Sequence, residues 1–135
     1  MKLIVVEDEK IIRTGLLKHV PWQRLGVSEV EAAANGEEAL AKTENFRPDI
    51  VLSDIRMPGM SGVDLCRKLR EKFPEIEIIF STGYADKEYL KAAIHCHPSL
   101  HSAVHLSILP FSFYYFSANT LISHFQYIWM HRLQV

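Results

Sequence analysis

The sequence is poor in cysteine and carries no excess of positive charge. Its 135 residues include only two cysteines, too few for a disulfide framework. A formal net charge of −1 excludes the broad basic surface that nucleic-acid binding requires. The N-terminal apolar run is short and is followed at once by acidic residues, which is not the pattern of a secretory signal. These features favour a cytoplasmic protein with one domain, long enough to bury a core.

Charge is missing from the last part of the chain. Residues 92–135 contain no aspartate, glutamate or lysine, and Arg132 is their one charged residue when histidine is counted as neutral. A protein surface normally carries charges of both signs, so this segment was not shaped by the same constraints as the rest. We therefore treat residues 1–94 as a core unit and residues 95–135 as an atypical tail.

Within the core unit, buried strands alternate with amphipathic helices. Short apolar runs bounded by turn residues predict strands at residues 3–6, 30–34, 50–53 and 76–80. Apolar residues at helical spacing, together with capping and stop signals, predict helices at about residues 12–20, 37–46, 62–73 and 87–94. This βαβαβαβα order predicts an α/β fold, a doubly wound parallel sheet with short connections.

Polar side chains follow three of the predicted strands. Glu7 and Asp8 follow the first, Asp54 ends the third, and Thr82-Gly83 follows the fourth. Right-handed crossovers place all these strand ends at one edge of the sheet. Each group alone is an ordinary strand end or turn, but three converging acids cannot all stay ionised without a cation. Their oxygens suit Mg²⁺, an aspartate can accept a phosphoryl group, and the Thr82 hydroxyl and Gly83 amide can hold its oxygens.

Three motifs carry a resemblance to a known family: V-V-E-D-E, S-D-I-R-M-P-G-M-S-G and I-I-F-S-T-G-Y-A-D. Over residues 1–94 the chain resembles the receiver domain of response regulators in two-component signalling. The resemblance implies a flavodoxin-like, CheY-like fold. The segments P-W-Q-R-L-G and A-A-A-N-G-E-E-A-L are similar to receivers attached to AraC-type transcription regulators.

The resemblance also implies a role for each motif residue. Asp54 matches the phosphoacceptor, and Thr82 matches the switch hydroxyl that moves towards the phosphoryl group. Asp8 matches the acid that binds Mg²⁺ directly, Glu7 its neighbour acting through water, and the Arg56 backbone carbonyl a further metal ligand. A sensor histidine kinase is the implied phosphoryl donor. Homodimer formation is a further expectation, whereas direct nucleic-acid binding and any enzymatic role beyond accepting phosphate are not expected.

The tail departs from the family at its fifth strand. Receivers end that strand with a lysine, followed by proline, which neutralises the phosphoryl group. This chain has no lysine after Lys91, and Leu109-Pro110 occupies the equivalent place if residues 103–109 form a substitute strand. Residues 120–133 carry the apolar face of a substitute last helix. The abrupt loss of acids and lysines favours a shifted reading frame or an altered 3′ end as the origin of residues 95–135. Either way, we expect Mg²⁺ binding to survive, phosphorylation to be slow and signalling to be weakly coupled.

Several competing interpretations remain open at this point. A phosphohydrolase that forms an aspartyl phosphate usually has a second aspartate two residues after the first, where this chain has Arg56. A non-signalling, aggregation-prone fragment would expose the aromatic cluster at residues 111–116. Residues 106–130 are apolar, but Pro110 and several polar residues make them a poor membrane span. His97, His101 and His105 have helical spacing that would suit a metal, although Pro98 disfavours it.

Overall fold

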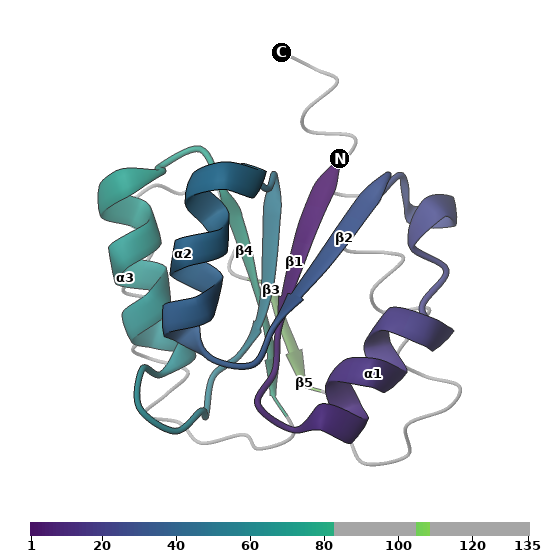
Figure 1. The fold of residues 1–135 in the computed structure, drawn as a ribbon, viewed down its shortest axis with the longest axis horizontal. Coiled ribbons are helices and arrows are strands. Elements are labelled where there is room, and N and C mark those ends of the chain that lie inside the picture. The colour runs from purple at the N-terminus through teal and green to yellow at the C-terminus, as the bar shows by residue number, and fades with distance from the viewer. Residues whose placement is uncertain (83–104, 109–135) are drawn as a thin grey trace.

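The protein forms a parallel β-sheet with helices on both faces (Figure 1). Its structure, a computed structural model, describes residues 1–82 and 105–108. The strands are β1 (Lys2–Val6), β2 (Glu29–Ala33), β3 (Ile50–Asp54), β4 (Glu77–Thr82) and β5 (His105–Ile108). The helices are α1 (Lys10–His19), a 3₁₀ turn η1 (Trp22–Leu25), α2 (Gly36–Phe46) and α3 (Gly62–Lys72). The predicted α/β order is confirmed, and the helix predicted at residues 87–94 lies outside the described residues.

The strand order is β2-β1-β3-β4-β5, and every neighbouring pair is parallel. The chain therefore moves from β1 to one side of the sheet to form β2, and then crosses to the other side of β1 to form β3. This reversal makes the carboxyl ends of β1 and β3 the switch point of the sheet, and open α/β sheets bind their ligands in the crevice outside such a point.

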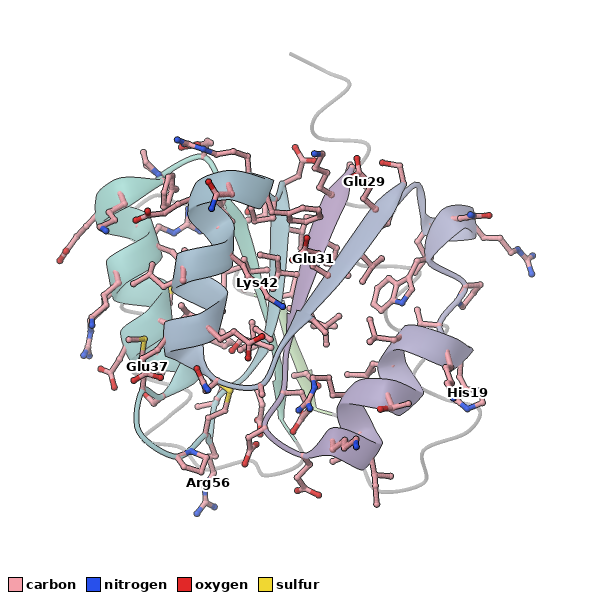
Figure 2. All side chains as sticks on the ribbon, in the orientation of Figure 1. His19, Glu29, Glu31, Glu37, Lys42 and Arg56 are labelled. Carbon is pink, nitrogen blue, oxygen red and sulfur yellow. The ribbon has the colours of Figure 1, made fainter. Side chains whose placement is uncertain are left out.

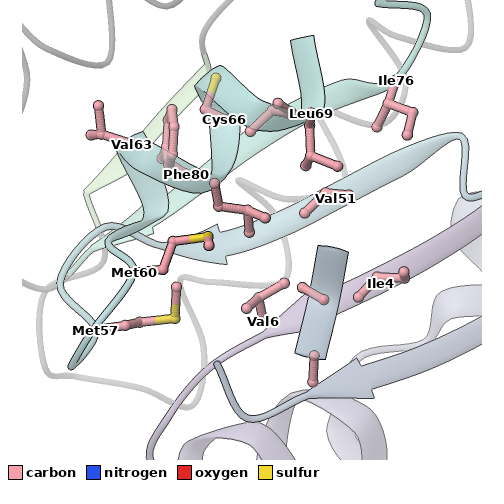
Figure 3. Close-up of a cluster of buried hydrophobic side chains, with 14 of the residues drawn as sticks. Ile4, Val6, Val51, Met57, Met60, Val63, Cys66, Leu69, Ile76 and Phe80 are labelled. Carbon is pink, nitrogen blue, oxygen red and sulfur yellow. The ribbon is translucent and has the colours of Figure 1, made fainter. Parts of the chain in front are cut away.

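Successive side chains of a strand point to opposite faces of the sheet, so the core is divided into two layers. Ile4, Val6 and Val51 belong to a cluster with the buried residues of α2 and α3, as Figure 3 shows. Leu3 and Val5 belong to a second cluster that includes residues of α1 and η1. In Figure 1, α2 and α3 cover one face of the sheet and α1 covers the other. Residues 3–6 of β1 and 50–52 of β3 are buried on both faces of the sheet, which is why these stretches are continuously apolar.

Two capping side chains set where α2 and α3 begin. The Asn35 Oδ1 atom accepts a hydrogen bond of 2.8 Å from the Glu38 amide, and the Ser61 Oγ atom accepts one of 3.1 Å from the Asp64 amide. Both caps satisfy amides that the first helical turn leaves without a partner. The two helices thus start directly after loops that border the crevice.

The edge strand β2 is lined with charge. Figure 2 shows Lys42 of α2 near Glu31, at an N–O distance of 4.0 Å. The Lys42 ammonium also donates to the Ala32 carbonyl oxygen at 2.5 Å and pairs with Glu38 at 3.0 Å. At the start of the strand, Glu29 pairs with Lys2 of β1 at 3.5 Å. Charged side chains at a sheet edge oppose pairing with the edge of another molecule.

The atypical tail supplies the other edge strand. β5 runs parallel to β4 with Ile108 paired to Thr82, which confirms a strand inside residues 103–109. Leu109-Pro110 and the helix predicted at residues 120–133 lie outside the described residues.

Two sequence predictions need correction. The helical spacing of Ile12, Leu16, Leu17 and Val20 predicts that all four lie on one apolar face, but Leu17 is 37% exposed because α1 turns mainly Leu16 towards the sheet. The fourth strand continues past Phe80 to Thr82, since β5 provides it with a partner.

β5 also corrects two of the alternative interpretations. His105 begins a strand, so it cannot share a helical face with His97 and His101, which lie outside the described residues. Residues 106–108 also belong to this strand, so they cannot form the start of a membrane-spanning helix. Within residues 1–82 and 105–108, no helix is long and apolar enough to cross a membrane.

Gly62 allows α3 to begin in contact with the end of β3. A Cβ atom at this position would lie 2.2 Å from the Asp54 carbonyl oxygen. The Gly62 amide also donates to the Ile55 carbonyl oxygen at 2.9 Å, so the backbone cannot easily move away. By contrast, a Cβ at Gly15, within α1, would meet no atom within 4 Å.

We expect Gly62→Ala to destabilise the fold by at least about 2 kcal/mol, because the added methyl group meets backbone rather than a flexible side chain. Gly15→Ala is the matched control, and it should stabilise the protein by roughly 0.5–1 kcal/mol through its helix propensity. Urea unfolding of both variants followed by tryptophan fluorescence measures the two free energies. Equal stabilities for the two variants would contradict the close approach at Gly62.

Candidate functional site

The structure brings three of the predicted acids together in the crevice. Glu7 and Asp8 follow β1, and Asp54 is the last residue of β3. One carboxylate oxygen of each lies within 4.8 Å of the other two. Glu7 is only 5% exposed, while Asp8 and Asp54 are half-buried. The convergence expected from the strand ends is therefore present in the fold.

Glu7 is held by backbone on both sides. Its amide donates to the Ala33 carbonyl oxygen at 3.1 Å, and its Oε1 atom accepts a hydrogen bond of 3.1 Å from the Glu9 amide. The pKa of Glu7 is raised from 4.5 to about 7, chiefly by burial, while the Glu9 hydrogen bond acts against the rise and the negative charges of Asp54 and Asp8 add to it. A cation close to Glu7 would favour the ionised form of this carboxyl and lower its pKa.

Asp54 has a raised pKa as well. Burial is the largest cause, the backbone amides of Arg56 and Ile55 act in the opposite direction, and Asp8 and Glu9 add repulsion. The Ile55 amide donates to the Asp54 Oδ1 atom at 2.7 Å. The two amides fix the direction of the carboxylate without neutralising it.

Buried side chains anchor the loop that follows Asp54. Ile55, Met57 and Met60 are buried in the same cluster as residues of α2 and α3. Figure 3 shows Met57 and Met60 in this cluster. Between Ile55 and Met57, the exposed Arg56 side chain points away from the body of the protein (Figure 2). Gly59 has a φ of 76°, a left-handed conformation that glycine adopts without strain. The loop is therefore fixed on its inner side, while its backbone borders the acidic cluster.

The structure describes Thr82 but not Gly83, the two residues predicted to bind the phosphoryl group. In the sheet register Asp54 pairs with Ser81, so Thr82, the last residue of β4, is one residue further along the neighbouring strand. Gly83 lies outside the described residues. The switch role of Thr82, the amide role of Gly83 and the carbonyl role of Arg56 stay predictions.

Arg13 is a residue of the site that the sequence interpretation missed. Its Nη1 atom donates to the Glu7 carbonyl oxygen at 2.6 Å and to the Asp8 carbonyl oxygen at 3.2 Å. The feature of the sequence that could have indicated this role is the presence of a basic residue in the first turns of the helix that follows the acidic pair. Periodicity assigned this residue to the polar face of the helix, and nothing in the pattern showed that it folds back.

Residues 3–99 match the model of the response regulator receiver domain. The chain belongs to this family. It is 37% identical over 93 residues to the transcriptional regulatory protein YesN of Bacillus subtilis, covering 69% of this chain and 25% of YesN. Transcriptional regulatory protein HptR of Staphylococcus aureus is 36% identical over 96 residues, covering 71% of this chain and 37% of HptR. The chain thus spans between a quarter and two fifths of the length of these receiver-containing relatives.

Solved structures give the same result for the fold. A two-component transcriptional regulator AraC from Clostridium phytofermentans has a TM-score of 0.77 at 27% identity, covering 100% of this chain and 99% of that one. The receiver domain of AraT, a response regulator from Geobacillus stearothermophilus, has a TM-score of 0.79 at 26% identity, covering 98% and 97%. The expected receiver fold and the likeness to AraC-type regulators are therefore confirmed.

Membership of the family has a plain chemical meaning. Receiver domains of two-component systems receive phosphate from histidine kinases and in general bind Mg²⁺. Three carboxylates within 4.8 Å of one another are a donor set that fits this ion. The boundary between the core unit and the tail stays a prediction.

The raised pKa of Glu7 predicts how stability depends on pH. Between pH 4.5 and about 7 the folded state holds a proton on Glu7 more tightly than the unfolded state does. Metal-free protein should therefore lose about 1–3 kcal/mol of stability, relative to Glu7→Gln, as the pH rises from about 5 to about 8. Glu75→Gln, a change at an exposed site, is the control and should follow the wild-type curve.

Urea unfolding in a chelating buffer across this pH range measures the effect. Adding Mg²⁺ should recover stability in the wild type chiefly at the high-pH end, where Glu7 is ionised. Parallel curves for wild type and Glu7→Gln would show that Glu7 titrates normally and that the cluster is not strained.

Proposed function

We propose that this chain accepts a phosphoryl group on Asp54 from a sensor histidine kinase, in a reaction that depends on Mg²⁺. The observation that carries the proposal is the gathering of Glu7, Asp8 and Asp54 within 4.8 Å at the switch point of the sheet. The family match and the position of Asp54 at the end of β3 support it.

The carboxylates present fit the metal that the family uses. Asp8, Asp54 and the Arg56 carbonyl oxygen would hold Mg²⁺ directly, with Glu7 acting through water. When bound, the ion supplies positive charge that offsets the repulsion among the acids and that of the phosphate oxygens. The raised pKa values of Glu7 and Asp54 support such a fit, and within residues 1–82 and 105–108 no ion pair joins a lysine or arginine to either carboxyl.

The chemistry of the transfer then falls to Asp54. A carboxylate oxygen of Asp54 attacks the phosphorus of a phosphohistidine, the bond between phosphorus and nitrogen breaks, and the electron pair stays on the histidine ring. The amides of Ile55 and Arg56 hold the carboxylate so that it is aligned before the donor arrives. The Thr82 hydroxyl and the Gly83 amide would receive the phosphate oxygens.

The lysine that neutralises the phosphoryl group in receivers has no counterpart in this sequence after Lys91. β5 ends at Ile108 opposite Thr82, and Leu109 follows where the lysine is expected. We infer that phosphorylation is slow and that its coupling to the rest of the protein is weak. Control of transcription would require residues like those that the longer relatives carry beyond this span. Homodimer formation, a cytoplasmic location and a shifted reading frame in the tail stay predictions.

A phosphohydrolase is a weaker alternative. Such an enzyme would use an acid/base two residues after its nucleophile, but Arg56 stands there and its side chain points away from the protein (Figure 2). Aggregation through the aromatic residues at 111–116 is the other alternative. Those residues lie outside the described part of the chain, and size-exclusion chromatography tests the point directly.

Asp54→Asn should abolish phosphate incorporation while leaving the fold intact, because the amide cannot attack phosphorus. Wild-type protein treated with a small phosphodonor such as acetyl phosphate should gain one acid-labile phosphoryl group, detected by intact mass. Chelation of Mg²⁺ should abolish the gain. Asp64→Asn, a change at a carboxylate outside the cluster, is the matched control. Incorporation that persists in Asp54→Asn would place the phosphate elsewhere.

Leu109→Lys should restore part of the missing function. A positive charge at this place is expected to speed incorporation by at least about tenfold, as for other groups that offset charge in a transition state. Leu109→Gln is the control for polarity without charge. The rate with acetyl phosphate at saturating Mg²⁺ measures the effect. Equal rates for the lysine and glutamine variants would show that the lost cation is not what limits the reaction.

A further inference from the structure

Arg13 makes an unusual choice of partners. It is half-buried in α1 near three clustered carboxylates, yet its guanidinium donates to two backbone carbonyl oxygens. Those carbonyls belong to Glu7 and Asp8, the two acids of the β1–α1 loop. In the part of the chain that the structure describes, no ion pair within 4.0 Å joins Arg13 to Glu7, Asp8 or Asp54.

This arrangement has a consequence for cation binding. An arginine that paired with the carboxylates would neutralise them and compete with a metal ion for the same oxygens. Because Arg13 uses its Nη1 donor on the main chain instead, the carboxylate oxygens stay available. Hydrogen bonds from a charged donor are also among the stronger ones, typically worth roughly 1.5–3 kcal/mol.

The same loop is held at several other points. The Arg13 amide donates to the Glu9 carbonyl oxygen at 2.9 Å, and the Glu7 amide donates to the Ala33 carbonyl oxygen at 3.1 Å. Next to Ala33, the Ala34 amide donates to the Glu38 Oε2 atom at 2.9 Å. The pKa of Glu38 is lowered chiefly by that amide, then by Lys42, with a smaller contribution from Arg13.

We propose that Arg13 is a positioning residue. By donating hydrogen bonds to the backbone carbonyl oxygens of Glu7 and Asp8, it fixes the directions in which their side-chain carboxylates point, and so preforms the cation site. The inference rests on the proposed function, since it assigns Arg13 a task in the same site. It does not make Arg13 a phosphoryl-binding group. Groups that orient metal ligands in this way commonly affect metal affinity by about 10- to 100-fold.

The test compares Arg13→Gln with Lys18→Gln in the full chain. Each variant removes one positive charge from α1, but Lys18 is exposed in the last turn, away from the acids. Arg13→Gln should weaken Mg²⁺ binding, measured by calorimetric titration, by about tenfold or more. Lys18→Gln should stay within about twofold of wild type, because an exposed distant charge is screened.

Arg13→Lys separates geometry from charge. It keeps the positive charge but lacks the planar fork that arginine presents to its acceptors. Its Mg²⁺ affinity should therefore fall between those of Arg13→Gln and wild type. Full recovery in Arg13→Lys, or an equal loss in Lys18→Gln, would reduce the role of Arg13 to charge alone and overturn the proposal.

A second measurement works without any metal. Amide hydrogen exchange of Glu7 and Glu9, whose N–H groups are both bonded in the folded loop, should be faster in Arg13→Gln than in Lys18→Gln by about tenfold. Unchanged exchange would overturn the positioning role even if Mg²⁺ affinity fell. If wild type bound no Mg²⁺ at all, the proposed function would fail, and this exchange measurement would still decide the role of Arg13.

Discussion

Repulsion among three carboxylates at one point of the sheet is the constraint on which the site depends. Parallel strands bring their carboxyl ends to the same edge, and the reversal of strand order at β1 and β3 opens that edge. Glu7, Asp8 and Asp54 meet there partly out of water, which raises the pKa of Glu7 to about 7. The two-layer core stabilises a fold that holds the charges together, and a cation at this point would relieve their repulsion.

The loops around the acids are rigid for reasons that lie outside the site. Ile55, Met57 and Met60 anchor the β3–α3 loop in the core, and Gly62 allows α3 to start against the Asp54 carbonyl. On the other side of the crevice, Arg13 binds the carbonyls of the β1–α1 loop. Preorganised backbone of this kind lets a site act without paying for its own ordering when a ligand arrives.

The tail shows that a sheet can accept a strand whose chemistry does not serve the site. β5 needs only an extended backbone to pair with β4, and His105–Ile108 provides it although the segment has no charge. Phosphate neutralisation, in contrast, requires one particular side chain at one particular place. A parallel edge strand is thus tolerant of sequence in its hydrogen bonding and intolerant in its function, so the proposed loss of read-out is compatible with an intact sheet.

The sequence by itself determined the α/β order, the receiver family and the identity of the acids, because buried strands and helices have different apolar periods and the S-D-I-R-M-P-G motif is specific. It also offered residues 103–109 as a substitute strand, which is where β5 lies. It did not determine the exposure of Leu17, the extension of β4 to Thr82 or the role of Arg13. Each of these depends on a tertiary contact. The exposure of Leu17 depends on how α1 lies on the sheet, and the extension of β4 depends on its partner strand β5. The role of Arg13 depends on the backbone carbonyls of Glu7 and Asp8, six and five residues earlier. Only the tertiary structure decided that Glu7 is buried deeply enough to hold a proton near neutral pH, because burial is a property of packing and not of the motif.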